Sequence, residues 1–151
     1  MTDPLLSIEN LTVVFKTRLG EVPVIDDVSF SIAPGEILGI VGESGCGKTM
    51  TSLAIMRLMP EQGKVTSGSI RLTGEDLVIA SEARMRSLRG NEISMVFQEP
   101  MTSLNPVFSV GEQIAEVLKA HQGLSKIEAR DHAVELLESV KIPLPSRRAN
   151  D

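Results

Sequence analysis

Two stretches near the start of the chain place hydrophobic residues at every second position. They are Leu11, Val13 and Phe15 in the first stretch, and Val28, Phe30 and Ile32 in the second. A period of two residues is typical of strands that bury one face. A polar turn at 18–21 separates the two stretches. The pattern therefore predicts two antiparallel strands.

Two other short runs are hydrophobic without alternation. Residues 36–41 follow the turn at Pro34-Gly35, and residues 93–97 precede Pro100, which cannot continue a central strand. Continuous apolar runs of this length are typical of strands buried on both faces. We therefore expect two core strands here, with a further short strand over 68–74 between them.

Four segments have the pattern of helices. The expected ranges are 50–59, which Pro60 would end, the polar segment 81–89, the segment 111–118, and a helix that begins at Ser125. Ser125 and Glu128 fit a capping box. The last helix has hydrophobic residues at helical spacing, with Pro143 and Pro145 expected to end it; they are Ala129, Ala133, Leu136, Leu137 and Val140.

A glycine-rich segment joins the first expected core strand to the first expected helix. It consists of Gly42, Glu43, Ser44, Gly45, Cys46, Gly47, Lys48 and Thr49. This sequence fits the phosphate-binding pattern Gly-x-x-x-x-Gly-Lys-Ser/Thr without a mismatch. Its glycines permit positive φ angles and a close approach of backbone N–H groups to phosphate oxygens. Lys48 supplies a charge for the β- and γ-phosphates, and the Thr49 hydroxyl is placed to bind Mg²⁺.

The composition indicates the cellular compartment of the protein and the classes of partner that it can bind. The 151 residues carry a net charge of −5, which argues against a nucleic-acid partner. We interpret the basic segment 84–89 as a solvated helix face. No hydrophobic run approaches the ~20 residues that span a bilayer, and the single cysteine, Cys46, suits a reducing compartment. These features predict a cytosolic protein, or one peripheral to a membrane.

Two segments closely resemble a known family. Residues 39–45 (GIVGESG) and 93–106 (ISMVFQEPMTSLNP) are similar to the ATPase subunits of bacterial dipeptide and oligopeptide importers, a branch of the ATP-binding cassette (ABC) transporters. The resemblance implies an α/β fold: a P-loop NTPase core with an antiparallel β subdomain and the start of a helical subdomain. It also implies ATP and Mg²⁺ as cofactors, and ATP hydrolysis coupled to peptide uptake.

The resemblance also implies partners and further site residues. The partners are transmembrane permease subunits, a second ATPase subunit and, indirectly, an extracytoplasmic solute-binding protein, at the cytoplasmic face of the membrane. Gln98 matches the family's glutamine that reaches Mg²⁺ and the attacking water, and Phe15 is the candidate for stacking on adenine, although core packing is an equal alternative. Met101, Leu104, Val107 and Phe108 either dock a permease helix or pack in the core. The expected nucleotide-binding set is Phe15, Gly42, Glu43, Ser44, Gly45, Cys46, Gly47, Lys48, Thr49, Met50 and Gln98, with Thr49 and Gln98 also binding the metal.

Residues 1–151 lack the family's signature motif, its Walker B strand and its switch histidine. Asp26-Asp27 precedes the glycine-rich segment and cannot replace Walker B. We therefore expect residues 1–151 to be an incomplete nucleotide-binding domain, with no catalytic residue and no hydrolysis of its own. Alternatives are a nickel or glutathione importer of the same branch, and a non-catalytic nucleotide-binding or docking module.

Overall fold

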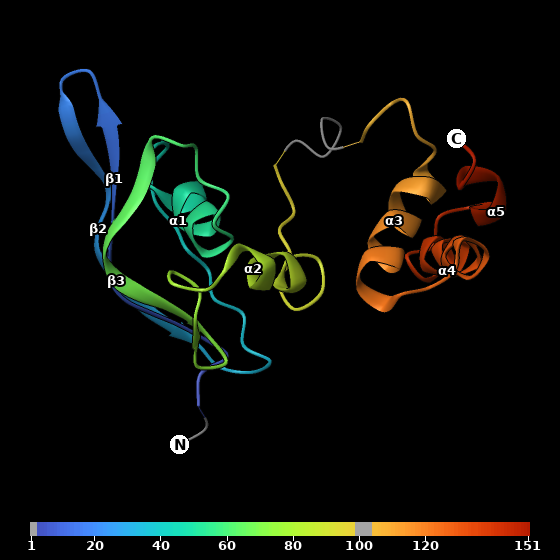
Figure 1. Cartoon of the computed structure of the whole chain (residues 1–151), viewed down its shortest axis with the longest axis horizontal. Coiled ribbons are helices and arrows are strands. Elements are labelled where there is room, and N and C mark those ends of the chain that lie inside the picture. Colours follow the sequence, from blue (N-terminus) through green and yellow to red (C-terminus); the bar gives the residue numbers. More distant parts are fainter. Residues whose placement is uncertain (1–2, 99–103) are drawn as a thin grey trace. The chain divides into compact units, whose positions relative to one another are not determined.

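The computed structural model describes residues 3–98 and 104–151. The chain forms two compact units, residues 1–89 and residues 90–151. Each unit has its own secondary structure and is described by itself (Figure 1).

The first unit contains an antiparallel sheet. Its strands are β1 (Leu6–Thr17), β2 (Gly20–Ile32), β3 (Gly63–Leu72) and β4 (Glu75–Asp76), in the order β2-β1-β3-β4. The predicted pair of antiparallel strands is confirmed as the hairpin of β1 and β2. The strand expected over 68–74 is also present, but it begins earlier, because Gly63 to Lys64 pair with Phe15 and Val14 of β1.

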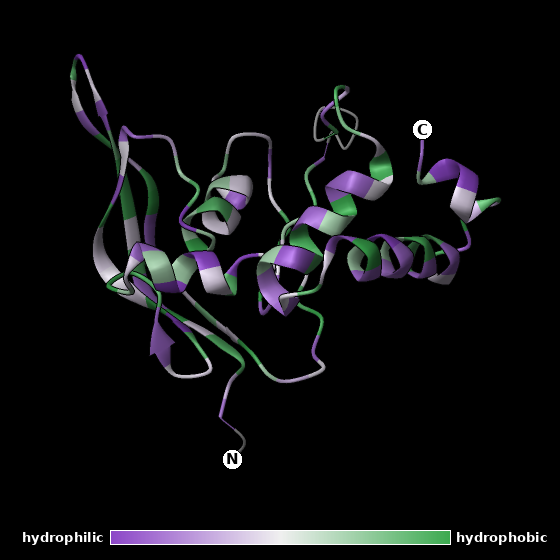
Figure 2. Cartoon of the chain, turned by 45° about the vertical axis from the view of Figure 1, so that its right-hand side comes forward, coloured by the Kyte–Doolittle hydropathy of each residue, from purple (hydrophilic) through white to green (hydrophobic). Residues whose placement is uncertain are grey.

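One face of β1 supplies much of the core of this unit. Leu6, Ile8, Leu11 and Val13 are all buried, although the spacing between Ile8 and Leu11 is three residues. A register irregularity between Ile8 and Leu11 compensates for the extra residue and returns the later side chains to the buried face. Two helices, α1 (Lys48–Ile55) and α2 (Glu82–Leu88), lie on the same side of the sheet (Figures 1 and 2).

The helix expected over 50–59 is shorter than predicted. It begins at Lys48 and ends at Ile55, well before Pro60. The backbone N–H of Arg57 bonds to Ala54 O at 3.0 Å and that of Leu58 bonds to Leu53 O at 2.8 Å, which is the Schellman arrangement. Arg57 has the left-handed φ of 50° that this arrangement requires. Local capping therefore ends the helix, and the proline does not.

The helix predicted over 81–89 is confirmed as α2, with Ser81 as its N-cap. The interpretation of 84–89 as a solvated face is wrong for Arg89, whereas Arg84 stays 38% exposed in an ion pair with Glu75. Arg84 Nε donates to both carboxylate oxygens of Glu75 at 3.0 Å, and the side chain of Arg89 is only 20% exposed. Folding places carboxylate and carbonyl acceptors beside these two side chains.

The two expected core strands do not form. Residues 37–43 and 94–97 have no regular secondary structure, and Ile37 and Val41 are 96% and 93% exposed. A strand buried on both faces needs hydrogen-bonded neighbours at its edges. Among residues 3–98 and 104–151, no strand pairs with either segment. The two segments are hydrophobic enough for core strands, but they do not form strands because no neighbouring strand among the described residues pairs with them.

The second unit is helical. It contains α3 (Val110–Gln122), α4 (Lys126–Ser139) and the short α5 (Pro145–Arg148). Ala115 and Leu118 of α3 pack with Ala129 and Ala133 of α4 in a common core. Hydrophilic and hydrophobic residues succeed one another along both long helices (Figure 2). No helix in the described residues is long and hydrophobic enough to cross a membrane.

The predictions for this unit hold with three corrections. The capping box of Ser125 and Glu128 is confirmed, but α4 ends before Val140, which is 67% exposed, and Pro145 begins α5 instead of ending α4. The helix expected over 111–118 extends to Gln122 and begins with a second capping box, Ser109 and Glu112.

Candidate phosphate-binding loop

The glycine-rich loop turns sharply before α1. Gly45 and Gly47 have φ angles of 84° and 96°, as the sequence predicts, whereas Gly42 has no positive φ. Gly42 lies close to Cys46 instead: a Cβ atom on it would lie 2.6 Å from Cys46 Sγ, so a side chain there would displace the thiol. The expectation of a positive φ is therefore wrong for Gly42 and confirmed for Gly45 and Gly47.

Gly47 fixes the start of α1 against the sheet. It is the N-cap of the helix, and a Cβ atom on it would lie 2.8 Å from the carbonyl oxygen of Val24 in β2. The carbonyl of Gly47 accepts hydrogen bonds from both Thr51 Oγ1 at 3.0 Å and Thr51 N at 2.8 Å. Thr51 is itself buried. The N-terminus of α1 is thus held by a backbone contact that only glycine permits.

The ammonium group of Lys48 lies within the turn of the loop. Lys48 Nζ donates to Gly42 O at 2.7 Å and to Glu43 O at 2.6 Å, and lies 3.3 Å from Cys46 Sγ. Thr49 follows on the first turn of α1 and is exposed. The loop, the lysine and the threonine therefore lie together at one helix end.

This arrangement has the chemistry of an anion site. The N–H groups at the start of a helix have no partners within the helix, and the helix dipole adds positive potential there. Successive N–H groups in a turn with left-handed residues form a concave anion-binding surface. Beside the loop, a cavity of about 350 Å³ lies between β2, residues 38–41 and α1. The residues present fit a phosphate group, with Lys48 as its counter-charge.

Two predicted site residues belong to other segments of the chain than the loop. The Phe15 ring is half-buried over Gly63, where a Cβ atom would lie 2.8 Å from Phe15 Cε2. Gln98 belongs to the second unit and is exposed. Their roles toward adenine and Mg²⁺ stay predictions. Within the described residues, no group of three or more His, Cys, Asp or Glu side chains could hold a metal ion.

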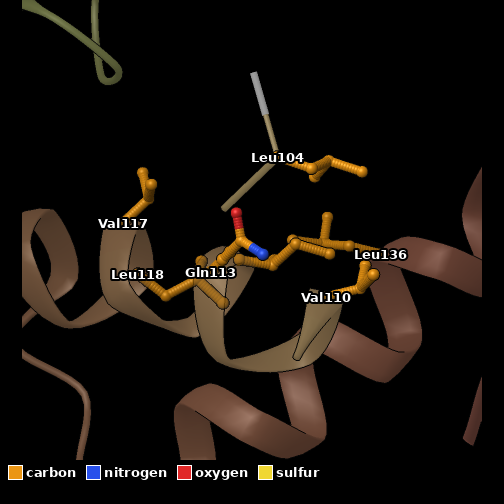
Figure 3. Close-up of a pocket in the computed structure, with 7 residues that line it drawn as sticks. Leu104, Val110, Gln113, Val117, Leu118 and Leu136 are labelled. Carbon is orange, nitrogen blue, oxygen red and sulfur yellow. The ribbon is translucent and has the colours of Figure 1, made fainter. Parts of the chain in front are cut away.

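The second unit exposes the hydrophobic residues expected to dock a partner. Leu104, Val107 and Phe108 are 50%, 81% and 55% exposed, so they do not pack in a core; Met101 lies outside the described residues. Leu104 borders a cavity of about 470 Å³ on α3 and α4 (Figure 3). The other residues that line this cavity are Val110, Gln113, Ile114, Val117, Leu118 and Leu136.

Sequence reasoning missed the role of Gln113. Its Nε2 atom donates to Asn105 O and Phe108 O, both at 3.0 Å, and its Oε1 atom accepts from Asn105 N at 2.9 Å. Figure 3 shows this side chain pointing toward the loop that carries Leu104. Gln113 therefore fixes the loop that presents these hydrophobic side chains. A polar residue within the hydrophobic face of α3 was the available signal.

A glycine-rich loop that fits Gly-x-x-x-x-Gly-Lys-Ser/Thr and leads directly into α1 has the features of a P-loop protein. The family model described as "ABC transporter" matches residues 25–150, and the chain belongs to this family. It is 48% identical to the "Putative peptide import ATP-binding protein" of Brucella abortus (strain 2308), over 99% of this chain and 45% of that protein. A second protein of that name and strain is 51% identical over 97% of this chain and 45% of its own length.

Solved structures support the same assignment of fold. A bacterial ABC transporter cassette, determined as a dimer, matches with a TM-score of 0.80 and 25% identity, over 96% of this chain and 60% of that one. The same cassette bound to ADP and Pi in a post-hydrolysis state matches equally well. The fold is that of an ABC nucleotide-binding cassette. The chain spans about half the length of the curated relatives that it matches.

Proposed function

We propose that this chain is the nucleotide-binding part of the ATPase subunit of a peptide importer. The geometry that carries the proposal is the loop around Lys48 at the N-terminus of α1. Membership of the ABC transporter family and the printed names of the relatives support ATP as the nucleotide and peptides as the solute. Residues 1–151 form an incomplete nucleotide-binding domain in this proposal.

Different residues of the chain would bind the phosphates, the Mg²⁺ ion and the adenine of Mg-ATP. The backbone N–H groups of residues 45–49 hold the phosphates, and the ammonium of Lys48 neutralises the β- and γ-phosphates. The Thr49 hydroxyl and the Gln98 amide oxygen bind Mg²⁺, which supplies charge stabilisation for the phosphoryl groups. Phe15 offers an aromatic face for adenine.

We infer the protein partners of the chain from the nucleotide site and from the exposed residues of the second unit. A second ATPase subunit completes the nucleotide site, as the dimeric form of the similar cassette suggests. The exposed residues Leu104, Val107 and Phe108 receive a cytoplasmic helix of the permease, at the inner face of the membrane. A solute-binding protein acts only indirectly, through the permease.

The test compares Lys48→Ala with Lys16→Ala, which removes the same charge from an exposed position on β1. Calorimetry with Mg-ATP should show an affinity about 10- to 100-fold lower for Lys48→Ala, because a charge-assisted hydrogen bond is worth roughly 1.5–3 kcal/mol. Lys16→Ala should bind like the parent chain. Equal affinities of all three would refute the nucleotide site.

The solute needs a separate measurement in cells that contain the whole transporter. Lys48→Ala should abolish uptake of a labelled dipeptide there. If dipeptide uptake is unchanged while nickel or glutathione uptake stops, the solute assignment is wrong and the ATPase assignment stands.

A further inference from the structure

Arg89 contacts the C-terminal end of the helix that carries the phosphate-binding loop. Its Nε atom donates to Met56 O at 2.8 Å and its Nη2 atom to Arg57 O at 3.1 Å. Its Nη1 atom donates to Glu82 Oε1 at 2.7 Å. The side chain is 20% exposed. One guanidinium thus joins α2 to the two residues that follow α1.

The C-terminal end of α1 has a strained backbone that the hydrogen bonds from Arg89 stabilise. Arg57 adopts a left-handed φ of 50° at a position where glycine is usual. A side chain at this position makes the conformation less favourable. The Arg57 guanidinium also donates to Leu77 O and Ala80 O, so its backbone and side chain are both anchored. The hydrogen bond from Arg89 lowers the pKa of the Glu82 carboxyl, so the ion pair stays charged to a lower pH than an unpaired glutamate would.

The other end of α1 bears the candidate site. The helix has eight residues and begins with Lys48 and Thr49. A helix this short is not stable alone and takes its direction from tertiary contacts. Its N-terminus is held by the contact of Gly47 with Val24, and its C-terminus is held by Arg89.

We propose that Arg89 is a positioning residue for nucleotide binding, which it supports by fixing the direction of α1. The hydrogen bonds of the Arg89 side chain described above go to Met56, Arg57 and Glu82, so its effect on the loop passes through the helix. The inference rests on the proposed function, because it assumes that Lys48 and Thr49 bind a nucleotide.

The test uses Arg89→Ala, Arg89→Lys and, as a matched control, Arg86→Ala. Arg86 lies on the same helix and is exposed. The first measurement is hydrogen exchange of α1 and of β1 in the whole chain without nucleotide. Arg89→Ala should accelerate exchange in α1 and leave β1 unchanged, and Arg89→Lys should have a smaller effect, because lysine cannot reach two carbonyls and Glu82 together.

The second measurement is the affinity for trinitrophenyl-ATP, a fluorescent nucleotide. Arg89→Ala should raise Kd about tenfold, Arg89→Lys less, and Arg86→Ala not at all. If Arg89→Ala does not fold, the positioning role is tested by the other two variants. Arg89→Lys should then have a higher Kd than Arg86→Ala, and equal Kd values would overturn the role.

The outcomes separate the two proposals. Faster exchange in α1 at unchanged affinity would overturn the positioning role and leave the nucleotide site intact. Equal acceleration in α1 and β1 would show a general structural role and would also overturn the inference. A parent chain that does not bind the nucleotide would contradict the proposed function, and the inference with it.

Discussion

Gly47→Ala tests whether the loop conformation depends on the sheet. The substitution adds one methyl group at a residue with a φ of 96°, and its Cβ atom would lie 2.8 Å from Val24 O. Gly45→Ala is the matched control, because Gly45 has a φ of 84° but no atom within 4 Å of its Cβ position. The two variants share the backbone strain and differ in the clash.

The expected magnitudes follow from this difference. A left-handed conformation costs an L-residue roughly 1–2 kcal/mol, which is the whole cost expected for Gly45→Ala. The clash in Gly47→Ala involves a backbone oxygen that cannot rotate away, and forced overpacking adds about 1–3 kcal/mol. The free energy of unfolding of a domain is only about 5–15 kcal/mol. Gly47→Ala should therefore remove a substantial part of the stability of the first unit.

The assay is urea unfolding followed by circular dichroism, since the chain has no Trp or Tyr for fluorescence. The relevant transition is the one that Mg-ATP shifts to higher urea, because a ligand stabilises the unit that binds it. Gly47→Ala should lower the midpoint of this transition more than Gly45→Ala does. Equal midpoints for the two variants would show that the contact between Gly47 and β2 does not hold α1, and would refute the reasoning.

Two further predictions follow from the loop and the helix caps. The Cys46 thiol is exposed within the phosphate-binding loop, so bound Mg-ATP should protect it from modification by a maleimide. Mass spectrometry measures the rate of this modification, and equal rates with and without nucleotide would contradict the prediction. Hydrogen bonds from Ser109 and Ser125 lower the pKa values of Glu112 and Glu128 below 4.5. These caps should stabilise the second unit fully above pH 4.5 and lose their effect as the pH falls through the lower, folded-state pKa values. Thermal melts from pH 7 to 3 should show this loss, and a variant with Gln at both positions should show a flatter profile; identical profiles would contradict it.

The sequence by itself determined the features that depend on neighbours along the chain. The phosphate-binding pattern that ends in Thr49 requires residue types at fixed spacings, and the structure shows the loop and helix that it predicts. The capping box of Ser125 and Glu128 joins residues three positions apart. The same signal at Ser109 and Glu112 would have given the correct start of α3. Such interactions are local, so a linear sequence displays both partners.

Only the tertiary structure decided the features whose partners are distant in sequence. Residues 36–41 have the composition of a core strand, but strand formation depends on neighbouring strands, and no strand in the described part of the chain pairs with them. Arg89 lies in a basic segment that suggested solvent exposure, yet its hydrogen-bond acceptors include Met56 O and Arg57 O, more than 30 residues earlier in the chain. Hydrophobicity and charge fix what a residue can do, whereas strand pairing and hydrogen bonding depend on which partners folding brings within reach.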